Sequence, residues 1–313
     1  MGHAQDEQAP TGCTVILCEE GAVGGIDQRG NGTSTRQIDA MSPTHIVDKV
    51  QGIMISGGSA FGLDTATGAM RYLEEKGIGF KYGPAHIPSV PTAVLFDLGL
   101  NSSNVRPDAE MGYQACLNAS NEQPAQGNYG AGSGATVGKI LGIDQAMKSG
   151  IGTAAKEIGE GVMVGAMVAV NAFGDVVDPS SGEIVAGARS KKNGKGEPLF
   201  ANSMEVMKGL VGKKITARMS DDNTVIGVVA TNARFNKIEA TKLAQMAQNG
   251  VVRTVRPAHT TGDGDTMFSL ATGEKTAEVN IVGAFAAQVI SEAILRAVRM
   301  AKSTGGLPAV EDL

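Results

Sequence analysis

Thr224 stands where a polar segment meets an apolar run, in the stretch SDDNTVIGVVATNARF that spans residues 220–235. A threonine whose amino side is freed can serve as nucleophile and base at once. Its α-amine has a pKa of about 8, roughly two units below that of lysine, and accepts the hydroxyl proton near neutral pH. A β-branched residue in a strand also holds its hydroxyl firmly. Two interpretations of this junction stay open at this point: an ordinary strand start at Thr224, or cleavage between Asn223 and Thr224 that frees the threonine amine.

Two acidic residues, Asp263 and Asp265, flank Gly264 in the stretch HTTGDGDTMF. In an extended chain this spacing sends both carboxylates to one face. Two close carboxylates cannot both ionise freely, so one is expected to titrate high and to exchange protons with Thr224. A glycine-rich turn is the alternative, whereas a calcium loop would need further ligands that the sequence lacks.

Residues 130–139, GAGSGATVGK, superficially satisfy a dinucleotide-binding pattern. A polar loop precedes them instead of a strand, and Ser133 and Ile140 break the phosphate-loop pattern, so nucleotide binding is not expected. The four histidines are far apart in sequence and form no H-x-x-x-H pair, so neither a metal nor a cofactor is predicted. His259 either orders the neighbouring acidic loop or has a purely structural role.

The composition indicates how the core is built and which partners to exclude. The chain has 313 residues, 42% of them hydrophobic, with 43 glycines, 4% aromatics and no tryptophan. Packing must therefore rely on close backbone approach and aliphatic layers, which suits stacked sheets and helices. The net charge of −5 comes without a basic patch, so neither nucleic acid nor an anionic membrane is an expected partner.

The cysteines and the N-terminal residues bear on the compartment. Cys13, Cys18 and Cys116 are an odd number without a C-x-x-C pair, which argues against a disulfide framework or a zinc knuckle. The first ten residues carry neither a basic nor an apolar signal region, and no apolar run approaches the length of a membrane span. We predict a cytoplasmic protein.

Alternating patterns of apolar residues predict the elements that must position Thr224. A Ser42 N-cap followed by proline favours a helix there, and Asn236 with Glu239 resembles a capping box. The predicted strands are 11–19, 52–58, 93–99, 161–171, 174–179, 224–231 and 266–272. The predicted helices are 42–50, 59–77, 107–119, 201–210, one beginning at 236, and 279–302, whose apolar stripe lies over a sheet.

This order of elements indicates an α/β fold of one domain over residues 1–313. Two central sheets with helices outside fit it better than a doubly wound sheet with a phosphate loop. Residues 180–223 are polar and linker-like, which would leave room for a severed chain end. The loop at 121–139 is dense in Gly, Asn and Gln, and we expect it near a functional surface.

Five stretches together resemble the L-aminopeptidase/D-esterase family, in family order and over nearly the whole chain. They are ISGGSAFGLDTATGAMRYLEE, VPTAVLFDL, GNYGAGSGATVGK, DDNTVIGVVATNARF and KLAQMAQNGVVRTVRPAHTTGDGDTMFSLATG. That family includes β-aminopeptidases and the nylon-oligomer (6-aminohexanoate-oligomer) endohydrolases. The Asn-Thr junction and the acidic pair are most similar to the endohydrolases.

The resemblance implies a four-layer αββα sandwich of the N-terminal nucleophile hydrolase type that cuts itself into chains 1–223 and 224–313. It implies no cofactor, a short peptide or amide-oligomer substrate, and a homotetramer or larger assembly. By position, Thr224 is the nucleophile and Lys139 matches an active-site lysine. Asn171 matches an amide that contacts the reacting carbonyl.

The resemblance also implies a substrate-binding segment at Gly58, Ser59 and Phe61 in the motif GGSAFG. Phe61 stands where several members carry a tyrosine that helps to hold the oxyanion, so this chain lacks that hydroxyl. The predicted activity is amide hydrolysis by a self-processed N-terminal threonine. The alternatives are an aminopeptidase or β-peptidyl aminopeptidase of the same family, an acyltransferase of the ornithine acetyltransferase type, and a non-enzymatic binding scaffold.

Overall fold

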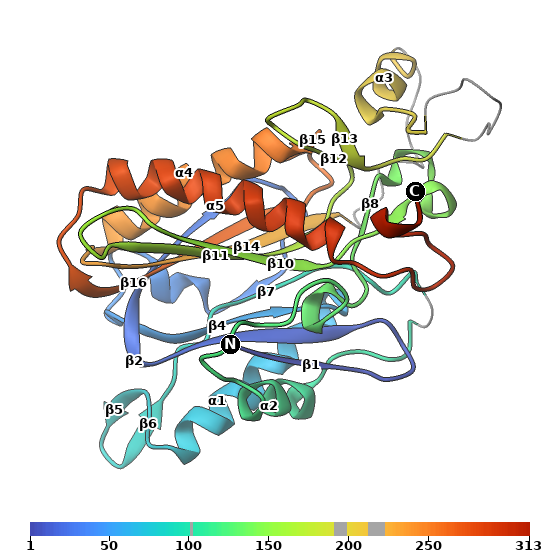
Figure 1. Cartoon of the computed structure of the whole chain (residues 1–313). Coiled ribbons are helices and arrows are strands. Elements are labelled where there is room, and N and C mark those ends of the chain that lie inside the picture. The colour runs from blue at the N-terminus through green and yellow to red at the C-terminus, as the bar shows by residue number, and fades with distance from the viewer. Residues whose placement is uncertain (101–102, 191–198, 212–222) are drawn as a thin grey trace.

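The structure is a computed structural model that describes residues 1–100, 103–190, 199–211 and 223–313. Helices, two sheets and further helices stack as four layers (Figure 1). Much of the predicted linker at 180–223, including residues 212–222 before Thr224, lies outside the described residues. The predicted αββα layering is therefore visible in the described part of the chain.

Within the described residues, nine strands are joined by hydrogen bonds. Eight of them follow the path β10-β11-β14-β16-β2-β4-β7-β3, and β1 pairs with β2 off this path. Their bounds are β1 Gly2–Gln5, β2 Gly12–Gln28, β3 Thr35–Arg36, β4 Val50–Ser56, β7 Thr92–Val94, β10 Ile151–Glu157, β11 Met163–Asn171, β14 Thr224–Ala233 and β16 Thr266–Lys275. The remaining strands are β5 Phe80–Tyr82, β6 Ala85–Ile87, β8 Thr136–Val137, β9 Met147–Lys148, β12 Asp175–Val177, β13 Ile184–Ala186 and β15 Val255–Arg256.

Strand β2 belongs to both sheet layers. Residues 13–17 pair with β4 and residues 23–28 pair with β16. Between these halves the register shifts and Gly21 takes a positive φ of 78°, a conformation that suits glycine. The bend folds the path of strands back on itself, so the two predicted sheets share this strand.

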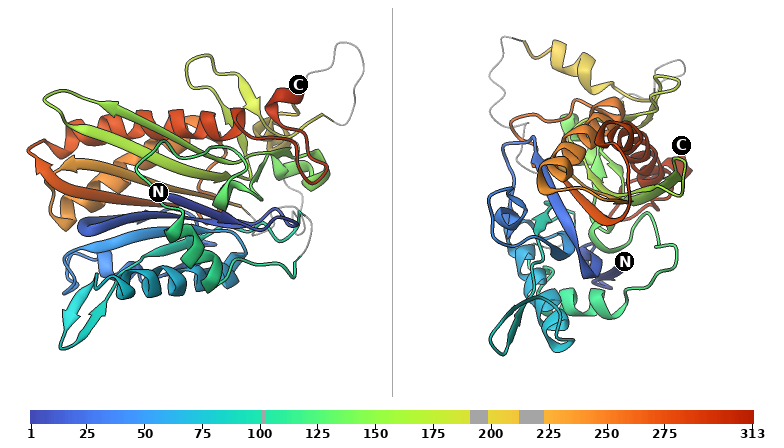
Figure 2. Two further views of the ribbon diagram at one scale, coloured as in Figure 1. Left: turned by 60° about the horizontal axis from the view of Figure 1, so that its bottom comes forward. Right: turned by 90° about the vertical axis from the view of Figure 1, so that its left-hand side faces the viewer.

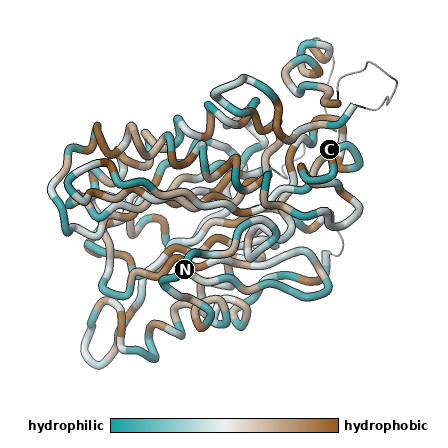
Figure 3. The backbone as a smooth tube through the Cα atoms, in the orientation of Figure 1, coloured by the Kyte–Doolittle hydropathy of each residue, from teal (hydrophilic) through white to brown (hydrophobic). Residues whose placement is uncertain are grey.

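Helices cover the outer face of each sheet (Figure 2). On one side α4 Lys237–Thr254 lies against β2 and β16, and α5 Val279–Arg299 lies against β10 and β11. On the other side α1 Thr65–Glu75 and α2 Ala109–Leu117 pack near β1, β2 and β4, while α3 Ser203–Lys208 stands apart from the layers. The tube in Figure 3 carries its hydrophilic colour mainly at loops and turns, as this layering requires.

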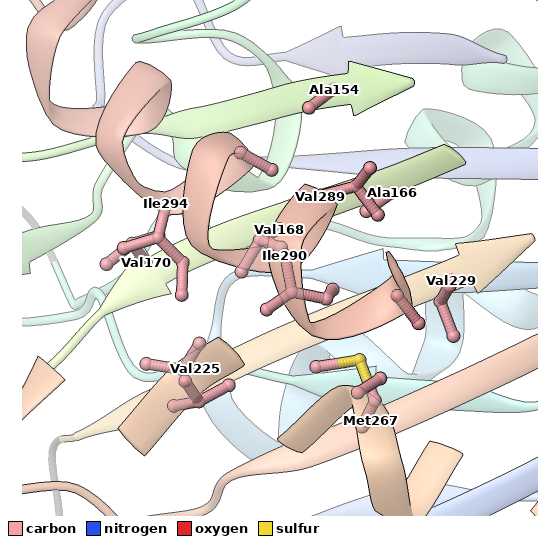
Figure 4. Packing of buried hydrophobic residues seen from close by; sticks show 14 of the residues in the cluster. Ala154, Ala166, Val168, Val170, Val225, Val229, Met267, Val289, Ile290 and Ile294 are labelled. Atoms are coloured by element: carbon pink, nitrogen blue, oxygen red, sulfur yellow. The ribbon is translucent and has the colours of Figure 1, made fainter. Parts of the chain in front are cut away.

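Apolar residues fill the three spaces between the layers. Figure 4 shows Ile290 and Ile294 of α5 facing valines of β11 and β14. A second cluster, with Ile53 and Phe268, fills the space between the two sheets, and a third packs α1 and α2 on the lower sheet. Aliphatic side chains dominate all three clusters, as the low aromatic content predicted.

Strand β14 shows how Thr224 is oriented. Successive side chains of a strand point to opposite faces. Val225 and Val229 belong to the cluster under the helices, whereas Ile226 and Val228 belong to the cluster between the sheets. Thr224 begins the strand, as predicted, and its position on the Ile226 face aims its side chain at the space between the two sheets.

The helix predicted at 42–50 from a Ser42 N-cap is wrong. A short 3-10 helix, Ile38–Met41, is followed by turns, and β4 begins at Val50. The ammonium of Lys237 on α4 donates to the carbonyls of Ala40, Ser42 and His45, at 3.2, 3.0 and 3.0 Å. Carbonyls that converge on a side chain from a distant helix are not arranged for helical hydrogen bonds.

Other predicted elements differ at their limits. The helix predicted at 59–77 starts as a 3-10 helix, Ser59–Asp64, before α1, and the strand predicted at 93–99 is only Thr92–Val94. The capping box of Asn236 and Glu239 is confirmed, with hydrogen bonds of 2.9 and 3.0 Å. The sequence did not predict the strands β1, β3, β5, β6, β8, β9, β10, β13 and β15.

Helix α5 carries the predicted apolar stripe and ends at Arg299, three residues before the predicted limit at Lys302. Among the described helices it alone has the length and composition that could cross a membrane, contrary to the prediction that no apolar run approaches a span. In this fold 67% of its apolar window is buried. Packing on β10 and β11 accounts for the composition as that of a core helix.

The close approach of α4 to β2 makes a stability prediction. A Cβ on Gly25 would lie 2.3 Å from the carbonyl carbon of Ala240 and 2.4 Å from the amide of Thr241, so Gly25→Ala must push backbone away. We expect it to lower the free energy of unfolding by about 3 kcal/mol.

The neighbouring Gly24→Ala is the matched control. Its Cβ would meet the flexible end of Met41 at 3.0 Å and should change the stability by less than about 1 kcal/mol. Denaturant unfolding of both variants checks the difference, and equal stability losses would contradict the close helix packing.

Candidate active site

The sheet register assembles the site around Thr224. Asn171, at the end of β11, lies opposite Thr224, and Asn223 forms a parallel bridge with Asp263. Strands β14 and β16 run parallel, so the segments that lead into them arrive at the same end of the sheet. Thr224 is 4% exposed and Asn171 is fully buried. The structure therefore brings the predicted nucleophile, amide and acidic loop together.

The carbonyl before Thr224 receives two hydrogen bonds. The Thr224 hydroxyl donates to the Asn223 oxygen at 2.6 Å, and the backbone N–H of Gly264 donates to the same oxygen at 2.7 Å. A Cβ on Gly264 would stand 2.7 Å from the Thr224 hydroxyl oxygen, so only glycine permits this approach. A preorganised N–H at this oxygen stabilises negative charge that develops on it.

Asp265 ties the acidic loop to the strand of the nucleophile. Its Oδ1 accepts from the backbone N–H of Val225 at 2.7 Å, one residue after Thr224. Its Oδ2 accepts from the backbone N–H of His259 at 3.0 Å and pairs with the ring Nδ1 of His259 at 2.8 Å. These three contacts fix the orientation of the buried Asp265 carboxylate.

Asp263 is a buried carboxyl group whose pKa is raised. Its pKa is raised to about 6. Burial is the largest cause and the charge of Asp265 adds to it, whereas hydrogen bonding by Thr260 and the charge of Lys139 oppose the rise. Its Oδ2 accepts from the backbone N–H of Thr260 at 2.6 Å. One carboxyl of the pair therefore titrates high, in agreement with the two-residue spacing.

Lys139 and Asn171 form one polar unit beneath Thr224. The Lys139 ammonium donates to Oδ1 of Asn171 at 2.9 Å and to its backbone oxygen at 3.2 Å, and the N–H of Thr136 also donates to Oδ1, at 3.0 Å. The Asn171 amide nitrogen donates to the Phe96 carbonyl at 2.9 Å. The side-chain amide of Asn171 is thus fixed, with a buried cation against its oxygen.

The predicted substrate-binding segment joins this cluster through the residues around Phe96. Gly58 and Ser59 have positive φ angles of 80° and 54°, and their N–H groups donate to Asp97 Oδ1 at 2.7 Å and to the Leu95 carbonyl at 3.0 Å. The segment therefore lies beside the carbonyl that holds Asn171.

Phe61 points away from that network toward solvent. It is 56% exposed, and the Arg106 guanidinium lies 3.6 Å from the centre of its ring. The structure thus places Phe61 on the surface beside Gly58 and Ser59, with a cation stacked on it rather than a donor for the reacting carbonyl.

Two buried charges near the site were not predicted. Asp97 and Lys148 influence each other, and burial raises the pKa of Asp97 to about 6 and lowers that of Lys148 to about 7. Lys148 donates to carbonyls of Gly132 and Ala135 at 3.0 Å each and to that of Ser149. A charged residue inside the apolar run AVLFDLG was the one available signal for Asp97, and AMKSG gave none for Lys148.

Two further residues matter that the sequence left open or unnamed. His259 contacts Asp265, so of the two roles considered for it, the ordering of the acidic loop has direct structural support. Gly264 supplies the N–H at the Asn223 carbonyl, a role that a turn glycine does not reveal in sequence. Among the residues that the structure describes, no group of three His, Cys, Asp or Glu side chains is placed to hold a metal ion.

The chain is similar to known proteins over almost its whole length. Residues 1–310 match the family model of peptidase family S58. An uncharacterised aminopeptidase of Mycobacterium leprae is 38% identical, over 95% of this chain and 84% of that protein. A 6-aminohexanoate-oligomer endohydrolase of a Kocuria strain is 29% identical, over 96% of this chain and 83% of that protein.

A solved structure supports the fold. The L-aminopeptidase D-Ala-esterase/amidase of Ochrobactrum anthropi, described as a variant of the Ntn hydrolase fold, superposes with a TM-score of 0.69 and 18% identity. The match covers 98% of this chain and 85% of that chain. The predicted α/β fold of the N-terminal nucleophile hydrolase type is confirmed.

The charges around Asp263 predict that two substitutions shift its pKa in opposite directions. Asp265→Asn removes a like charge and should lower the pKa of Asp263 below about 6, whereas Lys139→Met removes a stabilising cation and should raise it. Titration of the carboxyl carbon signals by NMR measures both shifts. Shifts of the same sign in the two variants would contradict the charge arrangement around Asp263.

Proposed function

The chain belongs to peptidase family S58 and is a hydrolase of amide bonds, and from this premise we propose that it activates itself by cutting between Asn223 and Thr224. One observation carries the proposal. The Thr224 hydroxyl and the Gly264 N–H meet the same oxygen of Asn223, at 2.6 and 2.7 Å. A nucleophile and an oxyanion donor at one peptide carbonyl are the two groups that an acyl shift requires.

Self-cleavage proceeds as an acyl shift followed by hydrolysis. The Thr224 oxygen attacks the carbonyl carbon of Asn223, and the C–N bond between the two residues breaks. The hydroxyl proton goes to the departing nitrogen of Thr224, and the Asn223 acyl group is held as an ester on the threonine oxygen. Water then hydrolyses the ester, which leaves a carboxylate on Asn223 and a free α-amine on Thr224.

In turnover the freed amine serves as the base for its own hydroxyl. Its pKa of about 8 lies close enough to neutrality for it to take the proton as the oxygen attacks a substrate amide, and to return a proton to the leaving amine. Asp263, with a pKa of about 6, exchanges protons with this amine. Lys139 and Asn171 stabilise developing charge, and water hydrolyses the acyl-enzyme.

The two chains 1–223 and 224–313 would stay together after cleavage. Strand β14 lies between β11 and β16 in the middle of its sheet, and α5 of the small chain packs on β10 and β11 of the large chain. Separation would expose apolar surface of the largest core cluster. Cleavage would therefore free the amino terminus of Thr224 while the two chains remain folded together.

The substrate class proposed is short linear amides, either peptides or 6-aminohexanoate oligomers. The oligomer is the substrate in the name of the Kocuria relative, and the aminopeptidase activity is in the name of the Mycobacterium leprae relative. The Asn-Thr junction and the Asp263–Asp265 pair favour the oligomer. Assembly into a homotetramer or larger oligomer, a cytoplasmic location and the absence of nucleic-acid and membrane partners stay predictions.

The self-cleavage proposal predicts the fate of two variants. Thr224→Ala should give a folded, uncut and inactive chain, since it lacks the oxygen that attacks. Thr224→Ser keeps that oxygen and should cut itself and retain activity. Denaturing gels, intact mass and amide hydrolysis measure all three properties, and an uncut wild-type chain with full activity would overturn the proposal.

A substrate panel separates the proposed function from its alternatives. We expect hydrolysis of linear 6-aminohexanoate oligomers, and an endohydrolase should also cut an oligomer whose amino end is acetylated. An aminopeptidase should cut only the oligomers or peptides with a free amino end. Preferential transfer of the acyl group to an added amine, with little hydrolysis, would instead indicate an acyltransferase.

A further inference from the structure

The structure assigns His259 as a positioning residue that fixes Asp265, and through it the start of β14, for the reaction of Thr224. This inference deepens the proposed function and rests on it. Among the hydrogen bonds of the described residues, none joins His259 to the Thr224 hydroxyl. Its contacts are with a carboxylate that itself holds the residue after Thr224.

One residue supplies two donors to a single carboxylate oxygen. The backbone N–H of His259 lies 3.0 Å from Oδ2 of Asp265, and the ring Nδ1 lies 2.8 Å from the same oxygen. The histidine side chain is 12% exposed and that of Asp265 is 2% exposed, so water competes little for this contact. Hydrogen bonds to a charged, buried acceptor are the strong ones.

The ring has a preferred tautomer in this setting. Oδ2 of a carboxylate is an acceptor, so Nδ1 carries the hydrogen that joins the two residues. The other ring nitrogen, Nε2, is buried and meets no hydrogen-bond partner in the described part of the chain. A hydrogen on Nε2 would be a buried donor without a partner, whereas a hydrogen on Nδ1 meets Asp265.

The backbone at His259 is held in a conformation that few side chains adopt. Its φ is 58°, in the left-handed region where histidine, asparagine and aspartate are several-fold enriched over other non-glycine residues. This conformation lets the N–H and the ring reach the same oxygen. A strained backbone conformation persists only where many surrounding contacts hold it, and such conformations cluster at functional sites.

The consequence for the reaction is geometric. With Oδ2 held by His259, Oδ1 of Asp265 is aimed at the N–H of Val225 at 2.7 Å, which fixes the peptide that follows Thr224. Gly264 lies between Asp263 and Asp265, and its N–H donates to the Asn223 carbonyl. A loosened Asp265 would therefore misplace the oxyanion donor and the nucleophile together.

An isosteric pair of variants tests the assignment. His259→Asn places an amide donor close to the position of Nδ1, and His259→Asp has the same shape and backbone tolerance but turns an acceptor toward Asp265. We expect His259→Asp to slow self-cleavage and to lower kcat by about 100-fold with little change in KM, as loss of a hydrogen bond to a charged group does. His259→Asn should recover at least ten-fold of that loss.

Two further proteins complete the experiment. His259→Gly keeps the backbone donor and tolerates the positive φ, so it should show a kcat loss close to that of His259→Asp even where the aspartate variant is poorly folded. His86→Asn, on the distant strand β6, is the matched control and should behave as wild type. Denaturant unfolding of each variant separates lost positioning from lost stability.

Two results would overturn the assignment. Equal kcat values for the asparagine and aspartate variants would reduce His259 to a packing residue. Retention of wild-type kcat within three-fold by the folded glycine variant would do the same. Activity in Thr224→Ala would instead defeat the proposed nucleophile, and it is measured independently of every His259 variant.

Discussion

Parallel hydrogen bonding between β14 and β16 brings two segments, 40 residues apart in the chain, to the same end of one sheet. Parallel strands need a crossover connection, which here contains α4, and the crossover returns the chain to the end where β14 began. Asn223 and Thr224 therefore meet the acidic loop before β16 without any long-range adjustment. If the two strands ran antiparallel, the acidic loop would lie at the far end of the sheet from Thr224.

This placement in a buried layer determines the electrostatics. Burial penalises charge, so a carboxylate keeps it only where donors compensate. Asp265 has three hydrogen-bond contacts within 3.0 Å that hold it in place, whereas the pKa of Asp263 is raised, by burial first and then by the charge of Asp265. Two aspartates separated by one glycine thus take different roles because their hydrogen-bond partners differ, which the spacing alone could not tell.

The sequence predicts what depends on local chemistry. The strand start at Thr224, the capping box at Asn236 and the apolar stripe of α5 each follow from residues within one turn or strand. Contacts between residues distant in sequence could not be predicted in this way. Three carbonyls within residues 40–45 accept hydrogen bonds from Lys237, and no helix forms there. β10 escaped notice because IGTAAKE lacks a run of β-branched residues, and Lys148 because its carbonyl partners come from tertiary structure.

Glycine residues permit close approach of backbone groups at the site as well as in the packing of the fold. A Cβ on Gly30 would stand 1.9 Å from the backbone oxygen of Asp263, and one on Gly264 would stand 2.7 Å from the Thr224 hydroxyl. The N–H that reaches the Asn223 carbonyl can do so only because neither position carries a side chain. At Gly25 the missing side chain lets α4 lie against β2. In the same way, the missing side chains at the site let a backbone N–H, rather than a long side chain, form the oxyanion contact. Backbone donors need little reorganisation as charge develops, so the glycine-rich composition is itself a source of the preorganisation on which the chemistry relies.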